Sequence, residues 1–213
     1  MHLFYKLSRC FFNLSFKFLY KLKVYGIEHL PKGPAILAPN HTSYWDPPMV
    51  GAAVPEELIF LGKEELFDNF FLKSAIKNLN TYPLGSSTRD LESMKLIIRF
   101  LKEGQKVVIF PEGERTVDGK LTEIKRGIGM IALRSEAPIV PIYIDGNYEI
   151  WPIFQKYPKL SGKATVVIGS PIYVNKFIEM PKKEAQVAIS QAVHKALENL
   201  KNWVKNGSLG PPP

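Results

Sequence analysis

The chain contains a single cysteine, Cys10, among its 213 residues. One thiol cannot close a disulfide within the chain, and it cannot supply a zinc site built from several thiolates. The four histidines are scattered along the sequence instead of being grouped as metal ligands. We therefore expect no metal site, and the scarcity of cysteine fits a reducing compartment.

Long apolar runs are also missing. A membrane-spanning helix needs about 20 consecutive apolar residues, whereas Lys6, Arg9 and Lys17 interrupt the aromatic-rich stretch at residues 1–23. That stretch lacks the clean apolar segment and small-residue cleavage site of a signal peptide. No serine lies in a Gly-x-Ser-x-Gly sequence, which excludes the nucleophile turn of the α/β-hydrolases.

Acidic residues are fewer than basic ones, 20 against 28, which leaves a net charge of +8. Such a balance favours an anionic partner: nucleic acid, an acidic membrane surface or a phosphorylated substrate. We expect no nucleic acid, because the aromatic residues cluster with lysines on one amphipathic stretch and not on a recognisable sheet platform.

The stretch 1–23 has helical periodicity with two distinct faces. Leu3, Leu7, Phe11, Leu14, Phe18 and Leu22 share the apolar face. Lys6, Arg9, Asn13 and Lys17 share the polar one. We predict a helix lying in the membrane interface, since this accounts for both the aromatic residues and the cations. A core helix of the domain and a helix that binds a hydrophobic partner protein are the alternatives.

The rest of the chain alternates between strand and helix patterns. Strands are predicted at 23–30, 35–39, 58–61, 82–84, 107–110, 139–144 and 164–168. Helices are predicted at 49–54, 64–79, from about 88 to 104, 124–134 and 182–204. Residues 24–205 therefore predict one α/β domain, with a mixed, largely parallel sheet flanked by helices. Residues 206–213 are expected to form a disordered tail.

One polar stretch, Asn-His-Thr-Ser-Tyr-Trp-Asp at residues 40–46, follows a buried-strand pattern and ends at two prolines. A histidine and a carboxylate in one turn can act as a base and its orienting partner. On a continuous helix His41 and Asp46 would point about 140° apart, but the prolines favour a helix that begins only near residue 47. We interpret Asp46 as its N-cap. A simpler interpretation stays open, in which Asp46 is only a cap and His41 a hydrogen-bonded loop residue.

A second polar loop, Phe-Pro-Glu-Gly-Glu-Arg-Thr at residues 110–116, directly follows the strand predicted at 107–110. In open α/β sheets ligands bind beyond the carboxyl ends of the strands. Both this loop and the turn containing His41 are therefore expected where a ligand would bind.

Together, Asn40-His41-x4-Asp46 and Phe110-Pro111-Glu112-Gly113-x-Arg115 resemble the PlsC family of glycerolipid acyltransferases. These are the 1-acyl-glycerol-3-phosphate acyltransferases, which make phosphatidic acid. Three more stretches resemble the family in the correct order: its lead-in at 26–34, its lysine-bearing helix entry at 62–66 and its proline-bracketed strand at 137–142. The likeness covers residues 24–175. It departs in the family's second motif, where Tyr-Pro-Leu at 82–84 is followed by Gly-Ser-Ser and the first arginine is Arg89.

The resemblance implies a role for each matching residue. His41 would deprotonate the acceptor hydroxyl, and Asp46 would fix the imidazole tautomer. Arg115 would bind the substrate phosphate, with further positive charge from Lys63, Lys125 and Arg89. Glu112 would orient Arg115 or accept a bond from a glycerol hydroxyl, and Gly113 would take a left-handed turn position. The remaining implied site, the acyl-donor pocket, involves Pro138, Ile139, Val140 and Pro141.

The function implied by the resemblance is transfer of a fatty acyl group from acyl-CoA or an acyl carrier protein to lysophosphatidate, by direct attack and without a metal or a cofactor. Another lysophospholipid or glycerol 3-phosphate is the alternative acceptor. A catalytically silent membrane-binding module is the alternative from another class. We expect a monotopic or peripheral protein on the cytoplasmic face of a membrane, in contact with its phospholipids.

Overall fold

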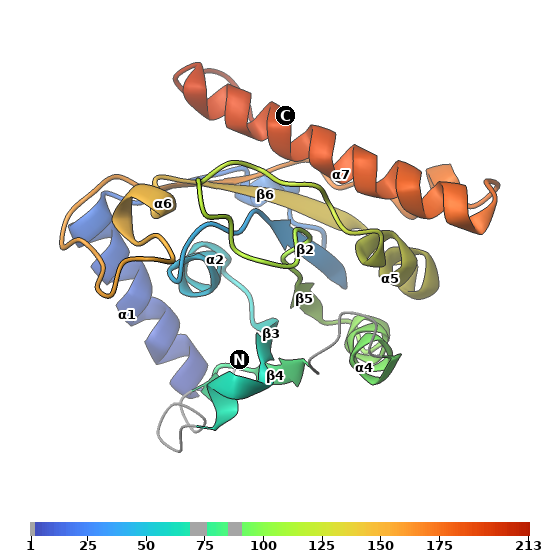
Figure 1. Cartoon of the computed structure of the whole chain (residues 1–213), viewed down its shortest axis with the longest axis horizontal. Helices are drawn as coiled ribbons and strands as arrows, with labels where there is room; N and C mark the ends of the chain where they lie inside the picture. The colour runs from blue at the N-terminus through green and yellow to red at the C-terminus, as the bar shows by residue number, and fades with distance from the viewer. Residues whose placement is uncertain (1–2, 69–75, 85–90) are drawn as a thin grey trace.

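The middle layer of the protein is a seven-stranded sheet within the described residues, which are 3–68, 76–84 and 91–213 of this computed structural model (Figure 1). The strand order is β1-β7-β6-β2-β5-β3-β4. The strands are β1 (Lys23–Tyr25), β2 (Ala35–Pro39), β3 (Leu58–Lys63), β4 (Thr81–Leu84), β5 (Lys106–Val108), β6 (Ile139–Asp145) and β7 (Thr165–Ile168). Neighbouring strands run parallel except β6 and β7. The predicted mixed, largely parallel sheet is confirmed.

Helices cover both faces of the sheet (Figure 1). One face carries α1 (Leu3–Tyr20), α2 (Asp46–Ala53) and the short α6 (Asn147–Ile150). The other carries α4 (Leu91–Lys102), α5 (Gly127–Ser135) and α7 (Lys182–Lys205). Three 3-10 turns join these elements: η1 (Ile27–His29), η2 (Glu64–Phe67) and η3 (Val174–Phe177).

The alternation of side chains along β2 shows how the sheet supports both helical layers. Ala35 and Leu37 belong to the core cluster that contains residues of α1 and α2. Ile36 and Ala38 belong to the cluster that contains residues of α4, α5 and α7. Successive residues of a strand face opposite sides, so a strand covered on both sides must be apolar throughout. This is why β2, the run that ends just before Asn40, contains no polar side chain.

Helix α1 packs on the domain through the side chains of Tyr5, Phe16 and Tyr20, which are buried. Of the predicted apolar face, Leu3, Leu7, Phe11, Leu14 and Phe18 are exposed, whereas Leu22, just beyond the end of α1, is buried. Two residues of the predicted polar face turn inward. Arg9 Nε donates to Val54 O at 2.8 Å, and Asn13 Nδ2 donates to Ala52 O at 3.0 Å. These carbonyls belong to the C-terminal end of α2, where helix carbonyls lack partners within the helix.

No helix among the described residues is long and apolar enough to cross a membrane. The exposed apolar side chains of α1 lie on the surface of the domain.

Two segments differ from their predicted form. The strand predicted at 23–30 ends at Tyr25, because the chain winds into η1, where His29 N donates to Gly26 O at 3.0 Å. The helix predicted at 64–79 begins as the 3-10 turn η2 at Glu64–Phe67, residues 76–77 are helical, and residues 69–75 lie outside the described part.

The C-terminal segment 206–213, expected as a disordered tail, returns to the body of the domain. Trp203 Nε1 donates to Leu209 O at 3.0 Å, and Ser170 N donates to Pro213 O at 3.1 Å. Backbone and indole hydrogen bonds thus give this proline-ended segment a defined course.

Candidate active site

The end of β2 is pinned to β6 by the side chain of Asn40. Its Nδ2 donates to Ile144 O at 3.1 Å, and its Oδ1 accepts from Ile144 N at 2.7 Å. The amide therefore continues the pairing of the two strands beyond the last residue of β2. Asn40 is buried, and the chain leaves it directly into His41. The position of His41 is consequently fixed by the sheet.

His41 and Asp46 form the pair that their spacing suggested. His41 Nδ1 lies 2.8 Å from Asp46 Oδ2, and the histidine side chain is 15% exposed whereas the aspartate is fully buried. Asp46 Oδ2 also accepts from Thr42 N at 2.7 Å and Ser43 N at 2.8 Å. Its other oxygen accepts from Asn147 Nδ2 at 2.8 Å. A buried carboxylate surrounded by donors orients the imidazole, with Nδ1 as the donor and Nε2 free to accept a proton.

We expected Asp46 to be the N-cap of α2, but it is the first residue of that helix. The N-cap is Trp45, which makes no capping bond through its side chain, and Pro47 and Pro48 occupy the first turn. The carboxylate instead turns back toward the preceding loop. A carboxylate at the beginning of a helix also meets the positive end of the helix dipole.

The His41 ring is held from its face as well as from its edge. It stacks on the ring of Phe110, with 3.9 Å between centroids and 22° between planes. Phe110 is the residue that opens the second polar loop, so the two predicted motifs meet at the imidazole. The ring therefore has one position, with one edge on Asp46 and one face on Phe110.

Glu112 has a different role from the one we expected. Its Oε1 accepts from His41 N at 2.8 Å, and its Oε2 accepts from Thr122 N at 2.8 Å and Thr122 Oγ1 at 2.7 Å. The side chain is buried. Its carboxylate therefore joins the turn that contains His41 to the loop of residues 110–122.

Arg115 lies against the turn that contains His41. Its guanidinium carbon is 3.9 Å from the centroid of the Tyr44 ring, a cation–π distance. The next residue along the chain, Thr116, donates from its backbone N to His41 O at 2.9 Å. The loop thus brings a fixed positive charge to the same turn as the imidazole, as the motifs predicted.

Of the other predicted cations, Lys125 lies near Arg115 in the same loop, whereas Lys63 lies farther along the edge of the sheet. Lys125 N donates to Pro111 O at 2.8 Å, and a side chain at Gly113 would meet carbon atoms of Lys125 at 3.5 Å. Gly113 has φ of 83°, so the predicted left-handed turn is present. Lys63 is exposed at the carboxyl end of β3, with β5 between β3 and β2. Arg89 lies outside the described residues.

The expected acyl-donor pocket is not open in this structure. Ile139, Val140 and Pro141 are buried in β6, and they pair with Ile36–Ala38 of β2. Pro138, half-buried, accepts a bond from the backbone N of Ile36. Both faces of β6 are covered by helices, and these residues lie toward the end of the strand away from His41. Of the four residues predicted for this pocket, only Pro138 therefore has appreciable exposed surface.

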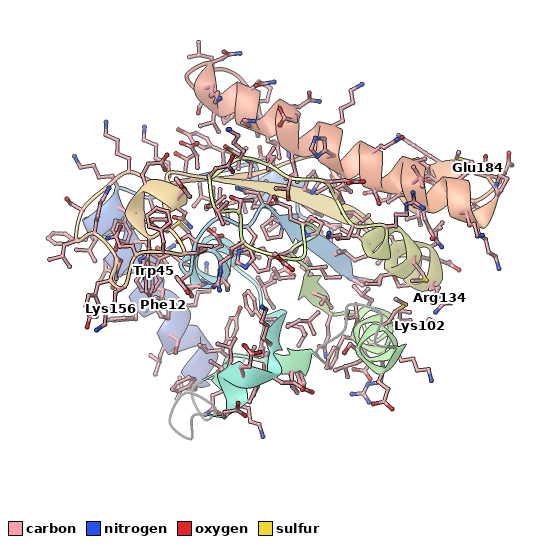
Figure 2. All side chains as sticks on the ribbon, viewed as in Figure 1. Phe12, Trp45, Lys102, Arg134, Lys156 and Glu184 are labelled. Atoms are coloured by element: carbon pink, nitrogen blue, oxygen red, sulfur yellow. The ribbon has the colours of Figure 1, made fainter. Side chains whose placement is uncertain are left out.

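An aromatic cluster connects α1 to the turn that contains His41 and Asp46. The Trp45 ring packs edge-on against Phe16 of α1 at 5.3 Å and against Trp151 at 4.9 Å, and its Nε1 donates to Tyr20 Oη at 3.3 Å. Trp151 in turn packs on Tyr44 at 5.0 Å. Figure 2 shows Trp45 beside Phe12 of α1. Trp45, the residue next to Asp46, therefore packs between α1 and the rest of the domain.

Sequence reasoning missed Asn147, although a signal for it exists. Asn147 follows the strand predicted at 139–144 and so lies at the carboxyl edge of the sheet, where β6 neighbours β2. Gly146 makes its approach possible: φ is 83°, and a Cβ there would lie 2.0 Å from Lys163 O. A polar residue directly after a buried strand was therefore the available signal.

The carboxyl group of Asp145, at the end of β6, is electrostatically perturbed. Burial raises its pKa above the usual value, the nearby Glu149 carboxylate raises the pKa further, and Lys205 opposes both effects. Burial disfavours the charged form of a carboxyl group. Asp145 is therefore a carboxylate that the folded state tolerates at a cost.

The chain was compared with known proteins. Residues 21–145 match the acyltransferase family. Over 183 residues the chain is 32% identical to the 1-acyl-sn-glycerol-3-phosphate acyltransferase of Bacillus subtilis, covering 85% of this chain and 88% of that protein. It is 28% identical over 174 residues to the chloroplastic 1-acyl-sn-glycerol-3-phosphate acyltransferase BAT2 of Brassica napus. That match covers 80% of this chain and 50% of the plant protein, so the chain spans about half the length of this relative.

A solved structure agrees with these sequence matches. The crystal structure of the 1-acyl-sn-glycerophosphate (LPA) acyltransferase PlsC from Thermotoga maritima is similar with a TM-score of 0.78 and 29% sequence identity. The alignment covers 92% of this chain and 79% of that chain. The chain therefore belongs to the acyltransferase family and is an enzyme that transfers acyl groups.

Proposed function

We propose that the protein is a 1-acyl-sn-glycerol-3-phosphate acyltransferase, which transfers a fatty acyl group from an acyl-CoA or acyl carrier protein thioester to lysophosphatidate. The observation that carries the proposal is one turn, residues 41–46, which holds the His41–Asp46 pair and contacts Arg115 through Tyr44. A proton acceptor and a phosphate-binding cation are thus built into one surface. Relatives named for this activity support the choice of acceptor.

In the proposed reaction His41 Nε2 accepts the proton of the acceptor hydroxyl as the hydroxyl oxygen attacks the thioester carbonyl. The C–O ester bond forms, the C–S bond breaks, and the proton passes from His41 to the departing thiolate. Asp46 stabilises the imidazolium between these steps, as a carboxylate does in hydrolase triads. A thioester is already activated for acyl transfer, so the chemistry requires neither a metal nor an added cofactor.

The acceptor phosphate is assigned to Arg115, with Lys125 as the second cation. A guanidinium can hold phosphate through two parallel hydrogen bonds, and the Tyr44 ring at 3.9 Å keeps that group in place before substrate arrives. Lys125 lies over Gly113 in the same loop. Lys63, exposed at the carboxyl end of β3, is assigned to a more distant part of the phosphate site or to the donor, and Arg89 takes the role of the missing second-motif arginine.

We further propose that α1 holds the enzyme in the interface of a membrane, on its cytoplasmic face, where lysophosphatidate and the product reside. Six large apolar side chains of α1 face solvent, while its opposite face packs on the domain: Leu3, Phe4, Leu7, Phe11, Leu14 and Phe18. Exposed apolar area of this kind marks an interaction surface. The flanking Lys6 and Lys17 suit anionic headgroups.

The test is an assay of the purified protein on lysophosphatidate, with labelled acyl-CoA of several chain lengths and with acyl carrier protein as donors. We expect phosphatidate as the product and a loss of about 10²–10⁴-fold for His41→Ala. His29→Ala is the matched control, because His29 Nδ1 contacts Ile168 O and not the site. Full activity of His41→Ala would reject the general base.

A panel of acceptors decides between the remaining possibilities. Faster transfer to another lysophospholipid or to glycerol 3-phosphate would replace the proposed acceptor. Binding to vesicles without transfer to any acceptor would favour a catalytically silent membrane-binding module. Phosphatidate formation that depends on His41 supports the proposal as stated.

A further inference from the structure

The loop that follows α6, residues 151–163, carries large apolar side chains that the fold leaves uncovered. Phe154 is 73% exposed, Tyr157 67% and Leu160 81%. Exposure of a single apolar residue is ordinary, but three within seven positions of one loop form a cluster. These side chains have no part in the catalytic turn described above.

The loop is firmly attached to the C-terminal end of α1 (Figure 1). Tyr20 Oη donates to Lys159 O at 2.9 Å, and Gly162 N donates to Leu19 O at 3.2 Å. Within the loop, Trp151 Nε1 donates to Gln155 O at 2.9 Å. The exposed side chains are therefore presented by a backbone that is fixed to the C-terminal end of α1.

The same regions of the chain carry basic residues and no acidic ones. None of the 20 acidic residues lies in residues 1–27 or 150–178. The loop contributes three exposed lysines, Lys156, Lys159 and Lys163, between its apolar residues. Figure 2 places Lys156 at the same end of the molecule as Phe12 of α1. Aromatic and apolar side chains interleaved with lysines, without acidic residues, suit an anionic lipid surface.

We propose that residues 152–163 are a second lipid-binding element, in which Phe154, Tyr157 and Leu160 enter the interface of an anionic membrane and the three lysines contact its headgroups. This inference rests on the membrane association proposed for α1. One surface helix can roll about its own axis, whereas a helix and a loop fixed to its end define a plane. The loop therefore sets the angle at which the domain lies on the lipid.

The orientation matters because the loop is in contact with the catalytic turn. Trp151, at the start of the loop, packs on Tyr44 at 5.0 Å and on Trp45 at 4.9 Å. Tyr44 carries the Arg115 guanidinium at 3.9 Å. Binding of the loop to lipid thus places the phosphate-binding arginine close to the headgroup layer, where a lysophospholipid presents its phosphate.

The experiment measures binding of the full chain to phosphatidylglycerol/phosphatidylcholine vesicles by co-sedimentation. The variant is Phe154→Ser with Leu160→Ser. The matched control is Ile178→Ser with Leu209→Ser, which removes two apolar side chains that are 62% and 80% exposed elsewhere. We expect the loop variant to bind at least about tenfold more weakly and the control to bind like the unmodified chain. Equal binding of the loop variant and the unmodified chain overturns the proposal, and so does an equal loss in the control.

Two further measurements test the contribution of the loop lysines and the depth at which the loop enters the lipid. Lys156→Gln with Lys159→Gln should weaken binding to these vesicles by about fivefold per lysine and leave binding to pure phosphatidylcholine unchanged. In Phe154→Trp, brominated lipid should quench more fluorescence than in the unmodified chain, and Ile178→Trp should show no such excess. Absence of excess quenching at position 154 contradicts insertion of the loop.

Vesicle binding requires no turnover, so this test is separate from that of the acyl transfer. A chain that fails to acylate lysophosphatidate but binds vesicles through the loop rejects the proposed reaction alone. A loop variant that acylates a short-chain, water-soluble lysophosphatidate normally but is slow on vesicle-bound acceptor supports both proposals. Normal rates on both acceptors overturn the role of the loop in orientation.

Discussion

Asn147 donates a hydrogen bond to Asp46 Oδ1 at 2.8 Å, across 101 positions of the sequence. The bond joins the first turn of α6 to the first residue of α2, and both residues are fully buried. Among the described residues, Asn147 and His41 are the only side chains that donate to the Asp46 carboxylate. Asn147 therefore positions Asp46, and we expect it to act as a positioning residue for the proposed His41–Asp46 pair.

Replacing Asn147 by alanine should lower kcat by about 5–100-fold, since one charge-assisted hydrogen bond of about 1–3 kcal/mol is lost. KM for the acceptor should change little, because Asn147 acts through Asp46. Asn13→Ala is the control: it removes a similar bond, to Ala52 O, at a distance from the turn. Steady-state kinetics with unfolding curves for both variants separates the two effects. A purely structural role would reduce stability in both and kcat in neither.

Glu112→Gln should destabilise the fold by about 1–3 kcal/mol and reduce kcat, because an amide cannot accept bonds at both of its ends. Thr122→Val should have a smaller effect in the same direction, because it removes only the hydroxyl bond to Glu112. The two changes should be less than additive in a double-mutant cycle, since they break one shared interaction. A rise in acceptor KM with unchanged stability would instead indicate that Glu112 binds substrate.

Arg115→Lys should raise the acceptor KM by about tenfold, because an ammonium cannot reproduce the two-pronged bond to phosphate. Tyr44→Leu should raise it by a few-fold, since about 0.5–2 kcal/mol of cation–π attraction holds the guanidinium. Arg99→Ala is the control, because that arginine lies over Phe100 and pairs with Glu103 on α4. Equal effects of Arg99 and Arg115 substitutions on KM would exclude a specific phosphate contact.

Asp145→Asn should stabilise the protein at neutral pH. Burial and Glu149 raise the pKa of the folded-state carboxyl, whereas in the unfolded chain the pKa stays near 3.8. As pH rises from that value through the folded-state pKa, the folded protein binds more protons than the unfolded chain, and stability falls. The asparagine variant lacks this loss, so its advantage should grow with pH across the window and vanish below it.

Denaturant unfolding at several values between about pH 4 and pH 8 measures this dependence. Asp118→Asn serves as the control of opposite sign. Hydrogen bonds from Lys120 lower the pKa of Asp118, an exposed carboxyl. Its replacement should therefore give no stabilisation at any pH. A pH-independent gain for Asp145→Asn would point to packing in place of titration.

The features that local sequence determines were predictable here. Apolar runs ending in polar loops located the strands, and the two prolines after Asp46 located the start of α2. The contact between His41 and Asp46 lies within one short turn, residues 41–46, so local sequence was enough to suggest it.

Features that depend on contacts distant in sequence were not predictable in the same way. The role of Glu112 depends on Thr122 and on the backbone of a turn 71 positions away. The roll of α1 depends on the free carbonyls at the end of α2, which attract Arg9 and Asn13 inward. Periodicity gives the faces of a helix but not which face meets the domain, especially where both faces carry aromatic residues.

The inward bonds of α1 bear on how a detergent-free preparation of the enzyme should be made. Deleting the helix would strip Phe16 and Tyr20 from the core and leave the carbonyls of Ala52 and Val54 without their donors. The shortened chain would then expose more apolar surface than the deletion removes. Exchanging only the outward side chains Leu7, Phe11 and Phe18 for glutamine keeps the packing of α1 on the domain. It changes only the polarity of the surface that the helix exposes to water.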